Sequence, residues 1–274
     1  MYGPRSGLYN LMSLNSIDVW SKKWLVQFNA SKSEDIVTGS RRAPVQPLTL
    51  MLNGVAIPQV TSVKHLGIFL SSDLQWKDQL HHVIRKVSGS IGMLRRMRRR
   101  LPAIFVKTIY VSVIRPSLEY AAAVWGSLCQ SDTWLLERVQ LQVVNMLCPD
   151  NLAGSHPSLL LKHHDLPTLA WRRQQQRLVL LWKLLNGCGP PDLIDQLPPV
   201  QRHRISTAQY SLRRQYRVTQ LRPRTAHEAS SWLCLAITEW NQLLVSAQSA
   251  TSLSTYKNLC CVSFSSDRFT YCVL

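Results

Sequence analysis

The spacing of apolar residues changes once along the chain, close to Trp76, and no other feature constrains the fold as strongly. Upstream of Trp76, short apolar runs are separated by turn residues, a pattern typical of β-strands. Downstream, apolar residues recur with the period of an amphipathic α-helix. The sequence therefore predicts an α+β chain that is predominantly α-helical, with a small β-hairpin module at its N-terminal end.

The dipeptide Asn53-Gly54 lies between two apolar runs, residues 48–52 and 55–57. Asn and Gly supply the two positive φ angles of a type I′ turn, so this pattern predicts a β-hairpin. A further extended stretch is expected over residues 60–70. Residues 14–28 have helical spacing and precede these strands.

Several helices are predicted after Trp76. The first carries on one face Leu80, Val83, Ile84, Val87, Ile91, Leu94 and Met97. Pro102 marks the start of the next helix, and Pro116, which has no N–H group, should kink or divide it. The helix over residues 132–147 is expected to turn inward Trp134, Leu135, Val139, Val143 and Met146. Later helical patterns cover residues 159–163, 168–186 and 230–244, and none is evident past Tyr256.

The chain of 274 residues is strongly basic, with 32 Lys and Arg against 15 Asp and Glu and a formal net charge of +17. Such a charge favours binding to polyanions, chiefly nucleic acid, although an ordinary basic protein is an open alternative. The seven Cys are scattered and form no C-x-x-C pair, which predicts free thiols in a reducing compartment. No secretory signal and no apolar run of about 18–20 residues is present, so we expect an intracellular protein, in the nucleus or cytoplasm, without a membrane partner.

Basic residues concentrate at the end of the first long helix. The candidate nucleic-acid-binding residues are Arg85, Lys86, Arg95, Arg96, Arg98, Arg99 and Arg100. Cations complement the dipole at a helix C-terminus, but five Arg between positions 95 and 100 exceed what that requires. Their mutual repulsion is relieved where phosphates neutralise them, and without interleaved aromatic residues such contacts carry no base specificity. A weaker Arg-rich group lies between residues 202 and 224.

Several strings, in the family's order, resemble the C-terminal half of the reverse transcriptases of non-LTR (LINE-type) retrotransposons. Residues 20–34 are similar to the palm segment after the active-site turn, and Tyr110 with residues 115–126 resembles the thumb signature. Residues 63–68, followed by Leu-Gln-Trp at 74–76, resemble the primer grip. This resemblance implies a primer-grip-like role for Lys64, His65, Leu66 and Gly67. Matching strings continue to about residue 257, including Glu239-Trp-Asn241.

The chain departs from that family at its catalytic centre. The resemblance implies an RNA-directed DNA polymerase, in which clustered carboxylates hold two Mg²⁺ ions. This sequence has no Asp-Asp pair, and no carboxylate precedes Leu14. Glu34-Asp35 is expected to be a solvated turn. We therefore expect no catalytic residues, no metal site and no cofactor in this chain, with Mg²⁺ required only by the intact family enzyme.

Together, the pattern and the resemblance divide the chain into seven segments. They are a disordered N-terminus (1–13), a residual palm and primer-grip module (14–74), a helical thumb (75–150), a helical region (151–190), an Arg-rich linker (191–224), a C-terminal helix (225–258) and a tail (259–274).

The expected function is that of a truncated, retrotransposon-derived, reverse-transcriptase-like protein. We expect it to be inactive as an enzyme and to bind RNA or DNA backbones with low specificity through its basic thumb. Two alternatives stay open: a partial gene for an intact polymerase, and a repurposed helical interaction protein. No P-loop or nucleophile elbow occurs, and a zinc site from Cys148, His156, His163 and His164 lacks the paired short spacings that such sites use.

Overall fold

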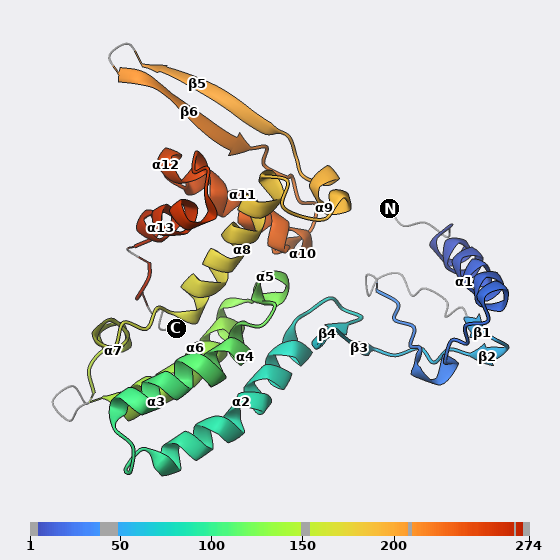
Figure 1. Cartoon of the computed structure of the whole chain (residues 1–274), viewed down its shortest axis with the longest axis horizontal. Coiled ribbons are helices and arrows are strands. Elements are labelled where there is room, and N and C mark those ends of the chain that lie inside the picture. The colour runs from blue at the N-terminus through green and yellow to red at the C-terminus, as the bar shows by residue number, and fades with distance from the viewer. Residues whose placement is uncertain (1–4, 39–48, 149–153, 208–209, 266, 271–274) are drawn as a thin grey trace. The chain divides into compact units, whose positions relative to one another are not determined.

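The computed structural model describes residues 5–38, 49–148, 154–207, 210–265 and 267–270, and the chain divides into two units, Met1–Gln79 and Leu80–Leu274 (Figure 1). Helices dominate and the strands near the N-terminal end form small two-stranded sheets, so the predicted α+β class is confirmed.

Two β-hairpins form the sheets of the first unit. Strands β1 (Met51–Leu52) and β2 (Val55–Ala56) pair antiparallel around Asn53 and Gly54, whose φ angles are 52° and 76°. This is the type I′ hairpin that the sequence predicts. Strands β3 (Ser62–His65) and β4 (Ile68–Ser71) pair in the same way. The single extended stretch expected over residues 60–70 is therefore wrong, because the chain reverses at Leu66 and Gly67, with φ angles of 47° and 83°.

Helix α1 (Arg5–Trp24) precedes the hairpins and ends where Leu25 adopts a φ of 55°. It begins inside the segment 1–13 that the sequence predicts to be disordered, and a short 3₁₀ helix, η1 (Ala30–Lys32), follows it. Among the described residues of this unit, the buried apolar side chains are Ala30, Leu50 and Leu52. Trp20, Trp24 and Leu25 are exposed, so this unit buries little apolar surface of its own.

The second unit contains most of helix α2 (Lys77–Met97), which begins in the first unit, and then α3 (Ala103–Ile109). Helix α3 continues into a π-helical turn, η2 (Tyr110–Ile114), and into α4 (Arg115–Glu119). Pro116 lies at the first turn of α4, where its missing N–H group and its ring disturb the preceding turn. The sequence predicted a kink or a division at Pro116; the helical backbone runs on through Pro116, with a π-helical turn before it, and ends at Glu119, so the helix is disturbed here but not divided.

Four further helices follow, α5 (Ala122–Trp125), α6 (Gln130–Leu147), α7 (Pro157–His163) and α8 (Leu169–Leu185). Thr168 caps the N-terminus of α8 by accepting a hydrogen bond from the Trp171 N–H group, and Gly187 follows its C-terminus with a φ of 73°. These boundaries agree closely with those predicted from capping residues and apolar spacing.

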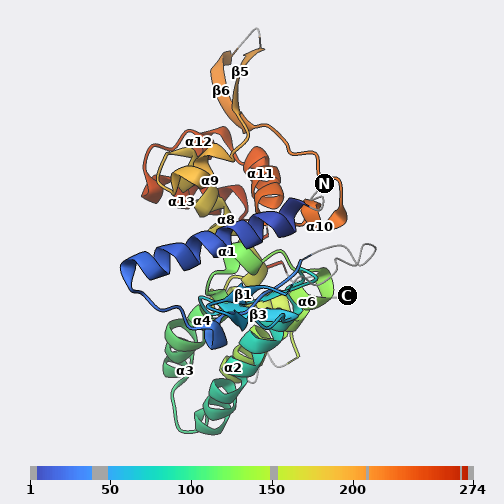
Figure 2. The ribbon, with the colours of Figure 1, turned by 90° about the vertical axis from the view of Figure 1, so that its right-hand side faces the viewer.

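A β-hairpin occupies the segment expected to be an Arg-rich linker, so that expectation is wrong. After α9 (Pro191–Asp195), strands β5 (Val200–Thr207) and β6 (Tyr210–Val218) pair antiparallel from Val200 opposite Val218 to Thr207 opposite Tyr210. Figure 2 shows this hairpin extending away from the helices of its unit. Arg and Gln dilute the Val, Ile and aromatic residues that mark strands, so the sequence carries only a weak strand signal here.

The C-terminal helices are α10 (Ala226–Ala229), α11 (Trp232–Gln242), α12 (Val245–Gln248) and α13 (Leu253–Ser263). Residues 257–263, where the sequence predicted no structure, thus belong to the last part of helix α13. Tyr256 is fully buried and stacks between Trp182 and Trp240, at centroid distances of 5.6 and 5.9 Å. Cys260 and Phe264 complete the same core.

Helix α8 is joined to three other helices through carboxylates. Arg172 pairs with Glu119 of α4, and Arg177 pairs with Glu239 of α11. Glu137 of α6 accepts hydrogen bonds from the Leu169 and Ala170 N–H groups at the N-terminus of α8, at 3.2 and 2.7 Å. Because buried ion pairs and caps require particular positions, these contacts fix how α8 packs against its neighbours.

Candidate nucleic-acid interface

The end of α2 positions the arginine cluster. Arg95 and Arg96 lie in the last turn of the helix, and Arg98 to Arg100 form the turn that follows it. The Arg98 N–H group donates to the Leu94 carbonyl at 2.8 Å, and the Arg100 N–H group donates to the Met97 carbonyl at 2.8 Å. Pro102 then immediately precedes the first residue of α3. The chain is therefore held in a tight turn that gathers cationic side chains at one point.

All five of these arginines, Arg95, Arg96, Arg98, Arg99 and Arg100, are exposed. Within the part of the chain that the structure describes, no carboxylate forms an ion pair with any of them. Arg115, Arg172 and Arg177, by contrast, are paired within the fold. The cluster therefore keeps its charge available to an external anion.

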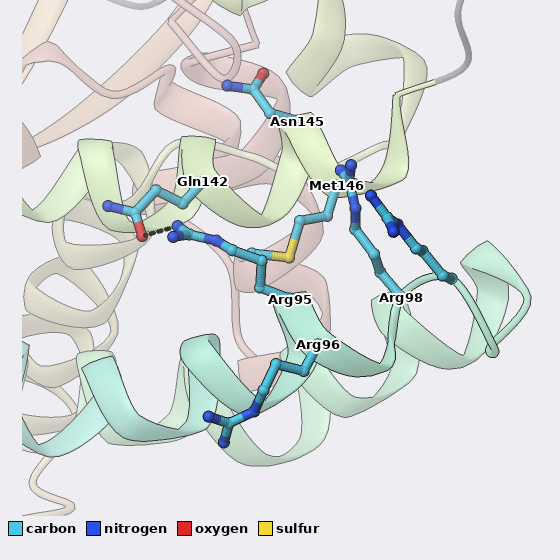
Figure 3. Close-up of a pocket in the computed structure, with 7 residues that line it drawn as sticks. Arg95, Arg96, Arg98, Gln142, Asn145 and Met146 are labelled. Atoms are coloured by element: carbon cyan, nitrogen blue, oxygen red, sulfur yellow. Dashed lines mark hydrogen bonds between the residues drawn. The ribbon is translucent and has the colours of Figure 1, made fainter.

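Four of the arginines line an open groove between the end of α2 and the face of α6, with a volume of about 640 Å³ (Figure 3). We call it the arginine groove, and its lining residues are Arg95, Arg96, Arg98, Arg99, Gln142, Asn145 and Met146. Arg95 and Arg98 reach toward α6, and the Arg95 guanidinium lies 3.4 Å from the Gln142 side-chain oxygen. No carboxylate is among these lining residues.

The other candidates from the sequence are not brought into the arginine groove. Arg100 is exposed but does not line it. Arg85 and Lys86 are exposed on α2. Arg85 precedes Arg96 by three helical turns, about 16 Å along the axis, and shares its face, whereas Lys86 points to another side of the helix. Only Arg85 could therefore extend the same cationic surface along α2.

The α6 wall of the groove was not predicted. The sequence pattern placed Met146 inward, but it is half-buried and lines the groove, and Gln142 and Asn145 are exposed beside it. Trp134 was also expected inward, but it is half-buried, with the Arg138 guanidinium 4.5 Å from its ring centre. The only sequence signal for this wall was the pair of polar residues three positions apart on one face of an apolar helix.

The primer-grip-like residues lie in the first unit. Lys64 and His65 end strand β3, and Leu66 and Gly67 form the turn to β4. All four are exposed. The Lys64 ammonium lies 5.6 Å from the Phe69 ring centre, a cation–π contact that holds this side chain along the hairpin.

The carboxylates of the described residues do not fit the paired Mg²⁺ ions of a polymerase. No group of three or more His, Cys, Asp or Glu side chains in that part of the chain is placed to hold a metal ion. Glu34 and Asp35 lie in an irregular segment where Asp35 bridges to Gln59. His163 and His164 contact each other edge-to-face, and His156 caps α7. The three histidines considered as zinc ligands are therefore engaged in local contacts.

Two curated proteins are similar to the chain. A "Retrovirus-related Pol polyprotein from type-1 retrotransposable element R1" of Bradysia coprophila is 27% identical over 182 residues, which are 63% of this chain and 17% of that protein. A "Probable RNA-directed DNA polymerase from transposon BS" of Drosophila melanogaster is 24% identical over 148 residues, 52% of this chain and 16% of that protein. The chain is a distant homologue of non-LTR retrotransposon reverse transcriptase polyproteins. The resemblance seen in the sequence is thereby confirmed.

The chain spans about a sixth of the length of these two relatives. No protein-family profile matches the chain, and the comparison with solved structures found no match. Among the described helices, none is both long and apolar enough to cross a membrane.

Proposed function

We propose that this chain binds the phosphate backbone of nucleic acid, with little dependence on base sequence, through the arginine groove at the end of its thumb-like helix α2. The observation that carries this proposal is that Arg95, Arg96, Arg98 and Arg99 all line one groove without a carboxylate partner among the described residues. The chain is similar to a Pol polyprotein and to a probable RNA-directed DNA polymerase. We therefore take nucleic acid as the polyanion that the groove binds.

Arginine suits this role because its planar guanidinium donates several hydrogen bonds to phosphate oxygens and stays charged at all physiological pH values. Each phosphate contact releases counterions, so binding should weaken steeply as salt rises. Contacts to phosphates set position and orientation but read no sequence. The remaining positive charge of the chain, formally +17 in total, strengthens the attraction at longer range.

The decisive experiment measures the affinity for a mixed-sequence oligonucleotide by fluorescence anisotropy over a range of salt concentrations. The variant R95A/R96A/R98A/R99A should reduce the slope of log affinity against log salt by up to about 4, since each lost phosphate contact contributes about 0.9. A control variant, K32A/K162A/K183A/K257A, removes four exposed lysines outside the groove and so lowers the net charge equally, from +17 to 17 − 4 = +13. This control should keep most of the slope. Equal losses in both variants would show that net charge, not the groove, holds the nucleic acid.

We propose further that this chain does not extend a primer by itself. The described residues contain no cluster of carboxylates placed to hold Mg²⁺, and the relatives are about six times longer than the matched region. In an intact polyprotein, the same groove would then serve a polymerase whose catalytic carboxylates lie elsewhere. Extension of a primed RNA template in Mg²⁺ by the purified chain should give no incorporation, and measurable incorporation would refute this part of the proposal.

A further inference from the structure

The arginine groove has two chemically different walls. The α2 wall presents guanidinium groups, which only donate hydrogen bonds. The α6 wall presents the exposed amides of Gln142 and Asn145, which both donate and accept. Phosphate oxygens need donors only, and the Gln142 oxygen accepts a hydrogen bond from Arg95, so phosphate binding leaves the acceptor of the Asn145 amide without a role. Base edges and sugar hydroxyls carry both donors and acceptors, and they match the second wall.

A second hollow adjoins the groove. Its volume is about 390 Å³, and Arg98 and Asn145 line both hollows. The second hollow is lined also by the apolar side chains of Leu141, Pro157 and Leu160, which could contact the faces of a ring, and by Cys148, Gly154 and Ser155, so its walls are about equally polar and apolar. A flat ring entering it from the arginine groove would leave its own phosphate near Arg98 and pass the Asn145 amide. Along the two hollows, a nucleotide would therefore meet a guanidinium for its phosphate, an amide for the polar edge of its base, and apolar side chains for the faces of the ring.

The sizes of the hollows bear on which nucleic acid fits. Both lie in the range of pockets that hold small molecules, about 300–1,000 Å³. A base of a single strand can enter such a hollow freely, whereas a paired base must first be unstacked and unpaired, at a substantial free-energy cost. A duplex could touch only the arginine wall through its backbone.

We propose that the arginine groove and the adjoining hollow together bind single-stranded nucleic acid in preference to a duplex, with phosphates on Arg95 and Arg98, the sugar beside Gln142 in the groove, a base in the second hollow, and Asn145 bonded to the polar edge of that base. This inference rests on the proposed function, because it assumes that the arginines contact phosphates. It assigns to Gln142 and Asn145 the selection between single and double strands.

The first test compares the anisotropy of a labelled single strand of about 12 nucleotides, a length within known single-strand site sizes, with that of its duplex. The wild-type chain should bind the single strand at least about fivefold more tightly, because the duplex loses the base contacts. The variant Q142A/N145A should lose about tenfold in single-strand affinity and clearly less in duplex affinity, because the duplex uses the amides only through the contact of Gln142 with Arg95. It removes no charge, so its salt slope should equal that of the wild type.

The matched control is Q130A/N258A, which removes two exposed amides that do not line either hollow and should bind like the wild type. Equal binding of single strand and duplex, or an unchanged single-strand affinity in Q142A/N145A, would overturn the inference. If binding is still salt-dependent and sensitive to R95A/R96A/R98A/R99A, the proposed function stands without it. If neither nucleic acid binds, or if polyglutamate competes as well as the oligonucleotide, the proposed function fails as well.

A second measurement uses Cys148, which lines the adjoining hollow and is half-buried. A C129S/C188S/C261S background removes the three thiols that are exposed among the described residues and keeps Cys148. Alkylation of Cys148 should be slowed several-fold by the single strand and little by the duplex, since only the single strand places a base in the hollow. Equal protection by both, or by neither, would count against the base-binding role of this hollow.

Discussion

The ion pair between Arg177 and Glu239 allows a quantitative test of how α8 is held to α11. The Arg177 Nε–H group donates to one Glu239 oxygen at 3.2 Å, and a terminal guanidinium nitrogen donates to the other oxygen. A third donor of Arg177 lies 3.4 Å from the Gly126 carbonyl oxygen. The side chains are only 8% and 14% exposed, so both charges are largely withdrawn from water.

Removing one partner should be costly because the other is left as an unpaired buried charge. Such losses are about 3–5 kcal/mol, a large part of the roughly 5–15 kcal/mol that stabilises a typical domain. R177M should lie at the upper end, because the Gly126 carbonyl also loses a donor, at a cost of about 1 kcal/mol. The double variant R177M/E239M replaces the pair by apolar side chains of similar length and should cost less than either single change.

Urea denaturation followed by tryptophan fluorescence would measure these free energies for the second unit, with an unchanged m-value as the check that the transition is comparable. The exposed pair of Arg268 and Asp165, with side chains 37% and 69% exposed, provides a control, and D165N should cost no more than about 1 kcal/mol. If the double variant R177M/E239M lost the sum of the two single losses, the two charges would not be coupled, and the reasoning from burial would be refuted.

Two buried side chains, and the small amount of apolar surface buried near the N-terminus, lead to three more tests. In Y110F, the Gln140 side-chain oxygen loses the buried hydrogen bond of 2.6 Å from the Tyr110 hydroxyl, while the Gln140 amide still donates to the Pro167 carbonyl. The free energy of unfolding, measured with urea, should fall by about 1–3 kcal/mol. No change would mean that water replaces the hydroxyl. Burial raises the pKa of the Cys260 thiol to about 12. The stability from the neutral thiol is therefore complete below its unfolded pKa of about 8.5 and declines as pH rises toward 12, and C260A should flatten this decline in alkaline denaturation. Amide hydrogens of the described residues up to 72 should exchange faster than those of residues 78–147, because two-stranded sheets with little buried apolar surface are marginally stable. Equal protection would show that the N-terminal residues are stabilised by some other core.

The long helices were predictable because their apolar faces and caps are local signals. Helix α8 has both a capping Thr168 and a Gly187 with positive φ. The turn of the second hairpin was not predictable, because Leu66 adopts a positive φ that its side chain disfavours. Helix α13 was missed for another reason: its burial depends on Trp182 and Trp240, which are distant in sequence.

In the candidate site, too, the local feature was predictable from the sequence and the long-range one was not. The arginines were visible as a run between positions 95 and 100, because charge density is a local property of the sequence. Their partners across the groove were not visible, because Gln142 lies 47 positions from Arg95 and only the packing of α6 beside α2 brings them together. The sequence therefore predicted the cationic wall of the groove but not its polar wall or the adjoining hollow.

The carboxylate contacts of α8 have a consequence for how descendants of this chain can diverge. A change of charge at position 177 leaves the Glu239 carboxylate on a different helix without its partner, and one at 172 leaves Glu119 with Arg115 alone, so such a change is better tolerated together with one at 239 or 119. Substitutions at these positions should therefore appear in pairs across related elements. The exposed arginines at the end of α2 carry no such internal constraint and are free to vary singly, as long as whatever they bind permits it.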